Sequence, residues 1–258
     1  MINHTNHISQ KFDQNLTRLY HQLGELGSLT VSAMHDIKLF IDALANKDEP
    51  LVGTFKQTEQ QTEEKLNKVL LIEIAINEEC ERILALYQPV ASDLRTVISI
   101  IRVLGEIQSI ANALQQMLKL VVRFNKSDAA EKDTVQKSVQ IIGVDKLSYL
   151  AGQTALLLEI AMQLIIEADL RQSKPILKQY KLSKQGYKRL IKLLDKKTDG
   201  NEGKMPIHSF RFAQEFLRVI THVKLIIGHF IYLNEGKNVR HLSFKQMREI
   251  MELSLDHE

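Results

Sequence analysis

The chain has 258 residues with a formal net charge of +3, and 44% of its residues are hydrophobic. This length is enough for one large domain or two small ones with a sizeable core. The low glycine and proline counts, 11 and 4, and the absence of tryptophan indicate long aliphatic helices rather than sheets. The single cysteine, Cys80, excludes an intramolecular disulfide, and the small net charge does not by itself indicate a polyanionic partner.

The sequence carries no clear targeting or membrane signal. Residues 1–12 lack the apolar core of a signal peptide. The longest apolar run, residues 155–166, is interrupted by Glu159 and Gln163, so we predict no transmembrane span. Because only one cysteine is present, nothing requires an oxidising compartment. We therefore expect a soluble cytoplasmic protein.

Four prolines divide the chain into strongly helical segments, because proline interrupts the backbone hydrogen bonding of a helix. They are Pro50, Pro89, Pro175 and Pro206. We expect six long helices and a short seventh, at residues 4–46, 48–86, 91–125, 129–170, 173–197, 206–233 and 244–255. The predicted fold class is all-α, with one spectrin-repeat-like three-helix bundle in residues 1–126 and a second, followed by the short helix, in residues 127–258.

The two halves show signs of an internal duplication. Four residues of the first helix align with four of the fourth helix at a constant offset of 124: Leu23, Leu26, Thr30 and Met34 with Leu147, Leu150, Thr154 and Leu158. Pro50 and Pro175 are 125 apart, whereas Pro89 and Pro206 are only 117 apart. We therefore expect the second helix of the second half to be shorter by about two turns, and the third and sixth helices to pack antiparallel or crossed.

The third predicted helix follows a strong start signal. Pro89 ends the preceding helix, Ser92 can act as N-cap, and Asp93 suits the positive end of the helix dipole. Apolar residues then recur at alternating spacings of three and four: Val97, Ile100, Leu104, Ile107, Ala111, Leu114, Leu118 and Val121. This spacing predicts a continuous apolar seam for packing against other helices.

The element PVASDLR at residues 89–95, followed by Glu106 and Ile107 of an ELERxGD-like helix, resembles the PhoU family, regulators of bacterial phosphate uptake. The matching residues of the first element are Pro89, Ala91, Ser92, Asp93, Leu94 and Arg95. The resemblance covers nearly the whole chain. It implies a cytoplasmic, often dimeric regulator without catalysis. Such a protein contacts the ATPase of the phosphate transporter and the membrane sensor kinase.

The family's metal-binding acids are replaced in this chain. Where the family has Glu and Asp four residues apart, the third helix has Gln108 and Asn112, and the sixth has Leu217 and Thr221, with only the intervening Arg218 retained. Hard cations need several anionic oxygens, so we expect no metal cluster and no other cofactor. Gln108 and Asn112 are expected at a hydrogen-bonded polar edge between packed helices.

Glu106 and two histidines are also expected to be non-ligating. On a helical wheel Glu106 falls far from Gln108, on an outer face where a surface ion pair with Arg102 is expected. His222 and His229 are seven residues apart, about two turns, which is too far to share one metal, so we expect both on the surface or facing a partner. Asp93 and Arg95 are explained by the helix start, with a signalling role as the alternative.

Positive charge is concentrated in residues 171–204, where eleven bases accompany three acids. Five lysines share one face of the predicted fifth helix: Lys174, Lys178, Lys181, Lys188 and Lys192. The opposite face is apolar, with Ile176, Tyr180, Tyr187, Ile191 and Leu194. This basic face is either a solvated outer surface or a docking surface for an acidic partner or an anionic membrane.

The sequence contains no glycine-rich phosphate loop, no nucleophile elbow and no acid and base pair assigned to one cleft. It also lacks the paired Glu-x-x-His motifs of carboxylate-bridged metalloenzymes. We predict a non-enzymatic regulator of phosphate uptake, with a transporter ATPase or carrier and a sensor histidine kinase as partners. The family resemblance implies a homodimer. Contact with the membrane complex is peripheral, and no nucleic acid is expected. The alternatives are a structural helical scaffold and an accessory subunit of an ion-coupled phosphate carrier.

Overall fold

The computed structural model describes residues 10–45, 52–126, 144–167, 173–198 and 207–255, and these residues contain helices and no strand. The helices are α1 (Gln10–Ala45), α2 (Val52–Tyr87), α3 (Ala91–Lys126), α5 (Val144–Glu167), α6 (Ser173–Thr198), α7 (Ile207–Glu235) and α8 (Phe244–Leu255). The predicted all-α class is therefore confirmed. Residues 129–143 of the predicted fourth helix lie outside the described residues.

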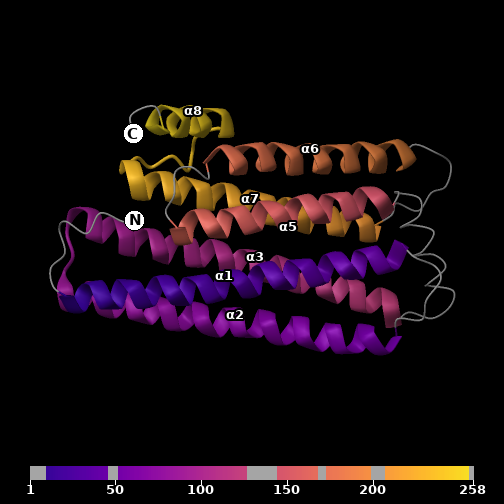
Figure 1. Cartoon of the computed structure of the whole chain (residues 1–258). Coiled ribbons are helices and arrows are strands. Elements are labelled where there is room, and N and C mark those ends of the chain that lie inside the picture. Colours follow the sequence, from indigo (N-terminus) through magenta and orange to yellow (C-terminus); the bar gives the residue numbers. More distant parts are fainter. Residues whose placement is uncertain (1–9, 46–51, 127–143, 168–172, 199–206, 256–258) are drawn as a thin grey trace.

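The long helices run side by side as two stacked groups (Figure 1). Helices α1, α2 and α3 form one group, α5, α6 and α7 form the other, and α8 lies at one end against α6 and α7. Between the groups, α1 packs against α5 and α3 packs against α7. A Cβ added at Gly27 would lie 3.2 Å from Met162, so α1 and α5 approach closely at this point. Contacts of Gly24 with Ile166 and of Gly152 with Lys38 show that these two helices are antiparallel.

The third and sixth predicted helices, α3 and α7, also pack antiparallel, as predicted. The guanidinium of Arg102 lies 4.8 Å from the ring centroid of Tyr232, near the end of α7. Arg95, at the start of α3, lies beside Gly236, which directly follows α7. The start of α3 therefore lies beside the end of α7, and polar as well as apolar side chains contribute to the contact between the two helices.

The residues that suggested a duplication occupy equivalent surroundings. All eight aligned positions of the first and fourth helices are buried. The hydroxyl of Thr30 donates to the carbonyl of Leu26, and that of Thr154 donates to the carbonyl of Leu150, both at 2.8 Å. The predicted shortening of the second helix is also confirmed, since α2 has 36 residues and α6 has 26. The difference is nearer three turns than two. A common origin of the halves and a boundary at residue 126 remain predictions.

Within the part of the chain that the structure describes, three helices are long and apolar enough to cross a membrane by length and composition alone. They are residues Ala91–Arg123, Asp145–Glu167 and Phe210–Glu235, with mean hydropathies of 1.4, 1.5 and 1.5. Our prediction of no span rested on one apolar run, residues 155–166, and that run did not reveal the apolar character of the three helices. In the structure, 56% of the most apolar stretch of each helix is buried. Each of these helices also contacts the other group, since α3 packs against α7 and α5 against α1, which accounts for much of their apolar surface.

Candidate functional site

The connection between α2 and α3 is tight and contains two residues with left-handed backbone conformations. Gln88 has φ 44° and Ala91 has φ 50°, and neither is glycine. The N–H of Gln88 donates to the carbonyl of Leu84 at 3.2 Å, which is the hydrogen bond of an αL helix end. A left-handed conformation costs an L-residue roughly 1–2 kcal/mol, so the surrounding packing must hold this turn in place.

The family element directly after this turn serves to anchor α3. The carbonyl of Val90 accepts the N–H of Asp93 at 3.1 Å, and α3 already begins at Ala91. The prediction of Ser92 as N-cap is therefore wrong, because Ser92 lies exposed within the first turn. Asp93 is only 4% exposed, and the half-buried Arg95 lies beside Gly236. The element thus connects the start of α3 with the end of α7.

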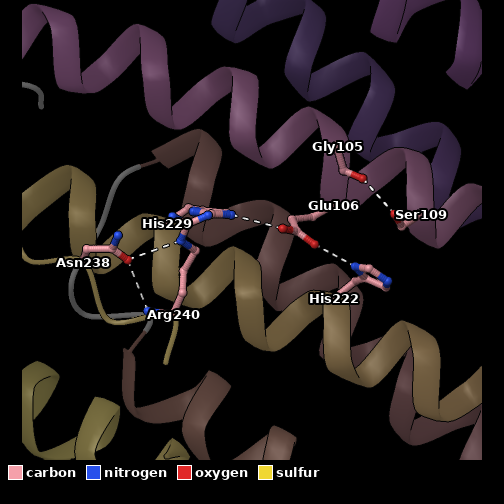
Figure 2. Close-up of polar contacts among 7 residues, drawn as sticks. All are labelled: Gly105, Glu106, Ser109, His222, His229, Asn238 and Arg240. Atoms are coloured by element: carbon pink, nitrogen blue, oxygen red, sulfur yellow. Dashed lines mark hydrogen bonds and ion pairs between the residues drawn. The ribbon is translucent and has the colours of Figure 1, made fainter. Parts of the chain in front are cut away.

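One carboxylate lies between two histidines at the α3–α7 interface (Figure 2). In this cluster Glu106 of α3 contacts Nδ1 of His222 through Oε2 at 2.6 Å, and Nε2 of His229 through Oε1 at 3.2 Å. The Glu106 side chain is 16% exposed, and His229 is 2% exposed. Each carboxylate oxygen therefore has its own histidine partner, and the three residues tie α3 to the middle of α7.

The charge on Glu106 is stabilised by these partners. Burial alone would raise the pKa of Glu106, but the hydrogen bonds and charges of His222 and His229 outweigh it. As a result the pKa of Glu106 falls from its ordinary 4.5 to about 2. The carboxylate is therefore ionised over the whole neutral range and acts as a fixed acceptor rather than as an acid.

This arrangement corrects three predictions. Glu106 is not on an outer face and does not pair with Arg102, which lies over the Tyr232 ring instead. His229 is buried and His222 is half-buried, so neither is simply a surface residue. The wheel for α3 alone placed Glu106 away from the main apolar seam but did not include α7, which covers that side. The spacing of seven between the histidines puts both on one face of a helix, and this shared face was the signal for a common partner.

The degenerate metal positions lie on outward surfaces of α3 and α7. Gln108 and Asn112 are both exposed, so the prediction of a hydrogen-bonded polar edge between packed helices is wrong. Leu217 is half-buried and Thr221 is exposed, and the Thr221 hydroxyl donates to the Leu217 carbonyl at 2.7 Å. Arg218 pairs with the adjacent Glu215 at 3.1 Å on the same helix. The retained arginine therefore forms an ion pair within its own helix.

Among the described residues, no group of three or more His, Cys, Asp or Glu side chains is arranged to hold a metal ion. At the four degenerate positions the available oxygens are neutral, and Leu217 has none to offer. These positions do not fit a multinuclear metal cluster. That the protein carries no metal remains a prediction, to be tested on the purified chain.

The basic face of α6 has the predicted orientation. Lys178, Lys181, Lys188 and Lys192 are exposed, and the side chain of Lys174 lies outside the described residues. Three of the five opposing apolar residues are buried and two are half-buried. The sequence thus correctly separated the two faces of α6. Whether the lysines bind a partner is a separate question.

Comparisons with known proteins agree on one family. The model of the PhoU domain matches residues 23–121. The chain is 24% identical to the phosphate-specific transport system accessory protein PhoU of Serratia marcescens, over 97% of this chain and 95% of the relative. It is also 24% identical to the PhoU homolog of Pseudomonas aeruginosa, over 96% and 95%. The Escherichia coli protein of the same name is 22% identical over 97% and 96%.

Solved structures support the same fold. The phosphate transport system regulatory protein PhoU from Streptococcus pneumoniae superposes with a TM-score of 0.69 at 18% identity. The match covers 88% of this chain and 99% of that one. PhoU from Pseudomonas aeruginosa gives a TM-score of 0.67 at 21% identity, over 88% and 100% of the two chains. At these identities the likeness establishes the helical architecture.

Proposed function

Because the chain belongs to the PhoU family, we propose that it is a non-catalytic regulator of phosphate uptake and of phosphate-starvation signalling. The observation that carries this proposal is the match to phosphate-specific transport accessory proteins over nearly the full length of both chains. Such coverage means that no large part of this chain is left for a different activity.

The regulatory role is tested by deleting the coding sequence in its source cell and measuring uptake of radiolabelled phosphate. We expect the deletion to leave uptake high when phosphate is abundant, because a negative regulator would be missing. Re-expression of the intact chain should restore the decrease. Unchanged uptake in the deletion would overturn the proposal and favour the alternative of a structural helical scaffold.

The partners that we propose are the ATPase of a phosphate transporter, or an ion-coupled phosphate carrier, and a sensor histidine kinase. In this scheme the chain acts as a cytoplasmic homodimer that contacts the membrane complex peripherally. The exposed lysines of α6 support an acidic partner surface, because long-range attraction between opposite charges speeds and orients association.

The partner surface is tested by reversing the charges of Lys188 and Lys192, both exposed on α6. Pull-down of the transporter component should weaken in Lys188→Glu/Lys192→Glu and at high salt, since exposed charges are screened within about 8 Å at physiological ionic strength. The matched control reverses Lys68 and Arg82, exposed bases on α2 that already pair with Glu25 and Glu79. Equal retention of the partner by all three proteins would remove α6 from the interface.

A further inference from the structure

A cleft of about 550 Å³ is lined by residues of α6 and α8. Figure 1 shows α8 at one end of the molecule, beside α6 and α7. Its volume is within the range of about 300–1,000 Å³ that is typical of small-molecule sites. Six of its lining residues are basic: Lys178, Lys181, Lys184, Lys188, Lys245 and Arg248. None of its lining residues is acidic. The cleft is therefore a concave site of strongly positive charge.

The walls of the cleft are held by packing that does not involve the basic groups. The Tyr180 and Phe244 rings stack at a centroid distance of 3.9 Å and an angle of 25°, which fixes the start of α8 on α6. The start of α8 is closed by a capping box, in which the backbone N–H of Ser243 donates to Oε1 of Gln246 at 2.9 Å. The position of Lys245 and Arg248 relative to the α6 lysines is thus set by rigid helices.

The lysines of the cleft are close neighbours of like charge. Lys178, Lys181, Lys184 and Lys188 follow one another at spacings of three, three and four, so they lie along one face of α6. Burial, followed by the charges of Lys188 and Lys224, lowers the pKa of Lys184. Lys245 lies 4.0 Å from Glu249, but both side chains are largely exposed, so this pair neutralises little. Folding therefore gathers several positive charges that repel one another.

We propose that this cleft binds a small oligophosphate, an anion that carries three or more negative charges on linked phosphate groups. Such an anion would contact lysines from both α6 and α8 at once and would offset their mutual repulsion. A membrane or a broad protein surface would reach the exposed lysines but not the half-buried Lys184 within the cleft. Oligophosphate binding would be a property beyond the regulation of uptake, and a binding measurement tests it independently of the uptake phenotype.

The test is isothermal titration of the full chain with sodium triphosphate at low salt, without divalent cations. We expect saturable binding that weakens at least tenfold in Lys181→Gln/Lys245→Gln, which removes one cleft charge from each helix. Lys184→Gln is a second variant and should weaken binding in the same direction. The matched control is Lys192→Gln, an exposed lysine of α6 that does not line the cleft, and it should change affinity less than twofold. Circular dichroism melting checks that each variant is folded.

Three further titrations identify the ligand and the alternatives. Inorganic phosphate should bind more weakly than triphosphate, because it spans fewer of the lysines. If adenosine triphosphate binds with the same affinity as triphosphate, the phosphates alone are recognised. If it binds more tightly, the ligand is a nucleotide. Both outcomes support the proposal. Absence of saturable binding would overturn it. So would equal loss in the cleft variants and Lys192→Gln, or binding only to phosphatidylglycerol vesicles, which would indicate a non-specific basic surface.

Discussion

The α3–α7 interface and the α6–α8 cleft use charge in opposite ways. At the interface, the single carboxylate of Glu106 lies between His222 and His229, so the charge finds its partners within the fold. In the cleft, six basic side chains line one hollow without an acid among the lining residues. A charge that is paired inside the fold ties helices together, whereas positive charges gathered along one cleft can attract an anion from outside.

The largest expected effect is at the interface. Glu106→Gln removes the negative charge between two histidines and should lower the free energy of unfolding by roughly 3 kcal/mol, because a partly buried ion pair is broken. Urea denaturation measures this difference. The matched control is Glu79→Gln, since the Glu79 side chain is 18% exposed, close to the 16% of Glu106, but its ion pair is with Arg82 on its own helix. The control should cost a few tenths of a kcal/mol; equal losses would show that the α3–α7 cluster has no special role.

The unmodified chain and Glu106→Gln should differ in how their free energy of unfolding depends on pH. The pKa of Glu106 is about 2 in the folded chain against an ordinary 4.5, so its ionisation stabilises the fold above pH 4.5. That contribution, about 3 kcal/mol, is lost as the pH falls from 4.5 through 2. The stability difference between the unmodified chain and Glu106→Gln should therefore shrink across this window. A difference that stays constant from pH 5 to pH 2.5 would contradict the pairing.

The cleft should respond in the opposite direction and more weakly. Lys184→Gln should raise the free energy of unfolding by about 0.5 kcal/mol, because the folded chain holds this ammonium close to other positive charges. The gain should fade at 1 M salt, where the screening length is about 3 Å. Lys192→Gln provides the comparison outside the cleft. Destabilisation by Lys184→Gln at low salt would show that the cleft is not a site of repulsion.

The smallest expected effect is that of added metal. With neutral side chains at Gln108, Asn112 and Thr221 and an apolar one at Leu217, Mn²⁺ or Fe²⁺ should leave the melting temperature within about 1 °C, since only ligands of the folded chain shift it by mass action. Elemental analysis of the purified protein should give substoichiometric metal. A large metal-dependent rise would indicate ligands elsewhere in the chain and would contradict the prediction of a metal-free protein.

Much of the architecture followed from periodicity alone. The apolar seam of α3, the prolines and the repeat of Leu26–Thr30 in Leu150–Thr154 each predicted a feature that the structure contains, because helix packing depends on spacing along one chain segment. The polar sites did not follow in the same way. Glu106 was misplaced because its partners are more than a hundred residues away, and a wheel for one helix cannot show which neighbour covers it.

The cleft illustrates the same limit. The lysines of α6 were visible in the sequence as one charged face, but their convergence with Lys245 and Arg248 depends on where α8 folds back. The sequence predicted a short helix at residues 244–255 but not where this helix packs. The position of α8 on α6 is fixed by the stacked rings of Tyr180 and Phe244, which are far apart in sequence.

The tight turn at Gln88 and Ala91 sets the direction in which the Glu106 side chain leaves α3. Glu106 lies fifteen positions after Ala91, and each residue of a helix rotates the side-chain direction by about 100°. A single residue inserted after the turn would swing the carboxylate away from both histidines while leaving every local sequence signal intact. The two left-handed residues therefore serve as a fixed origin from which the rotational phase of α3 is counted, and the chain depends on the length of this segment as strictly as on its side chains.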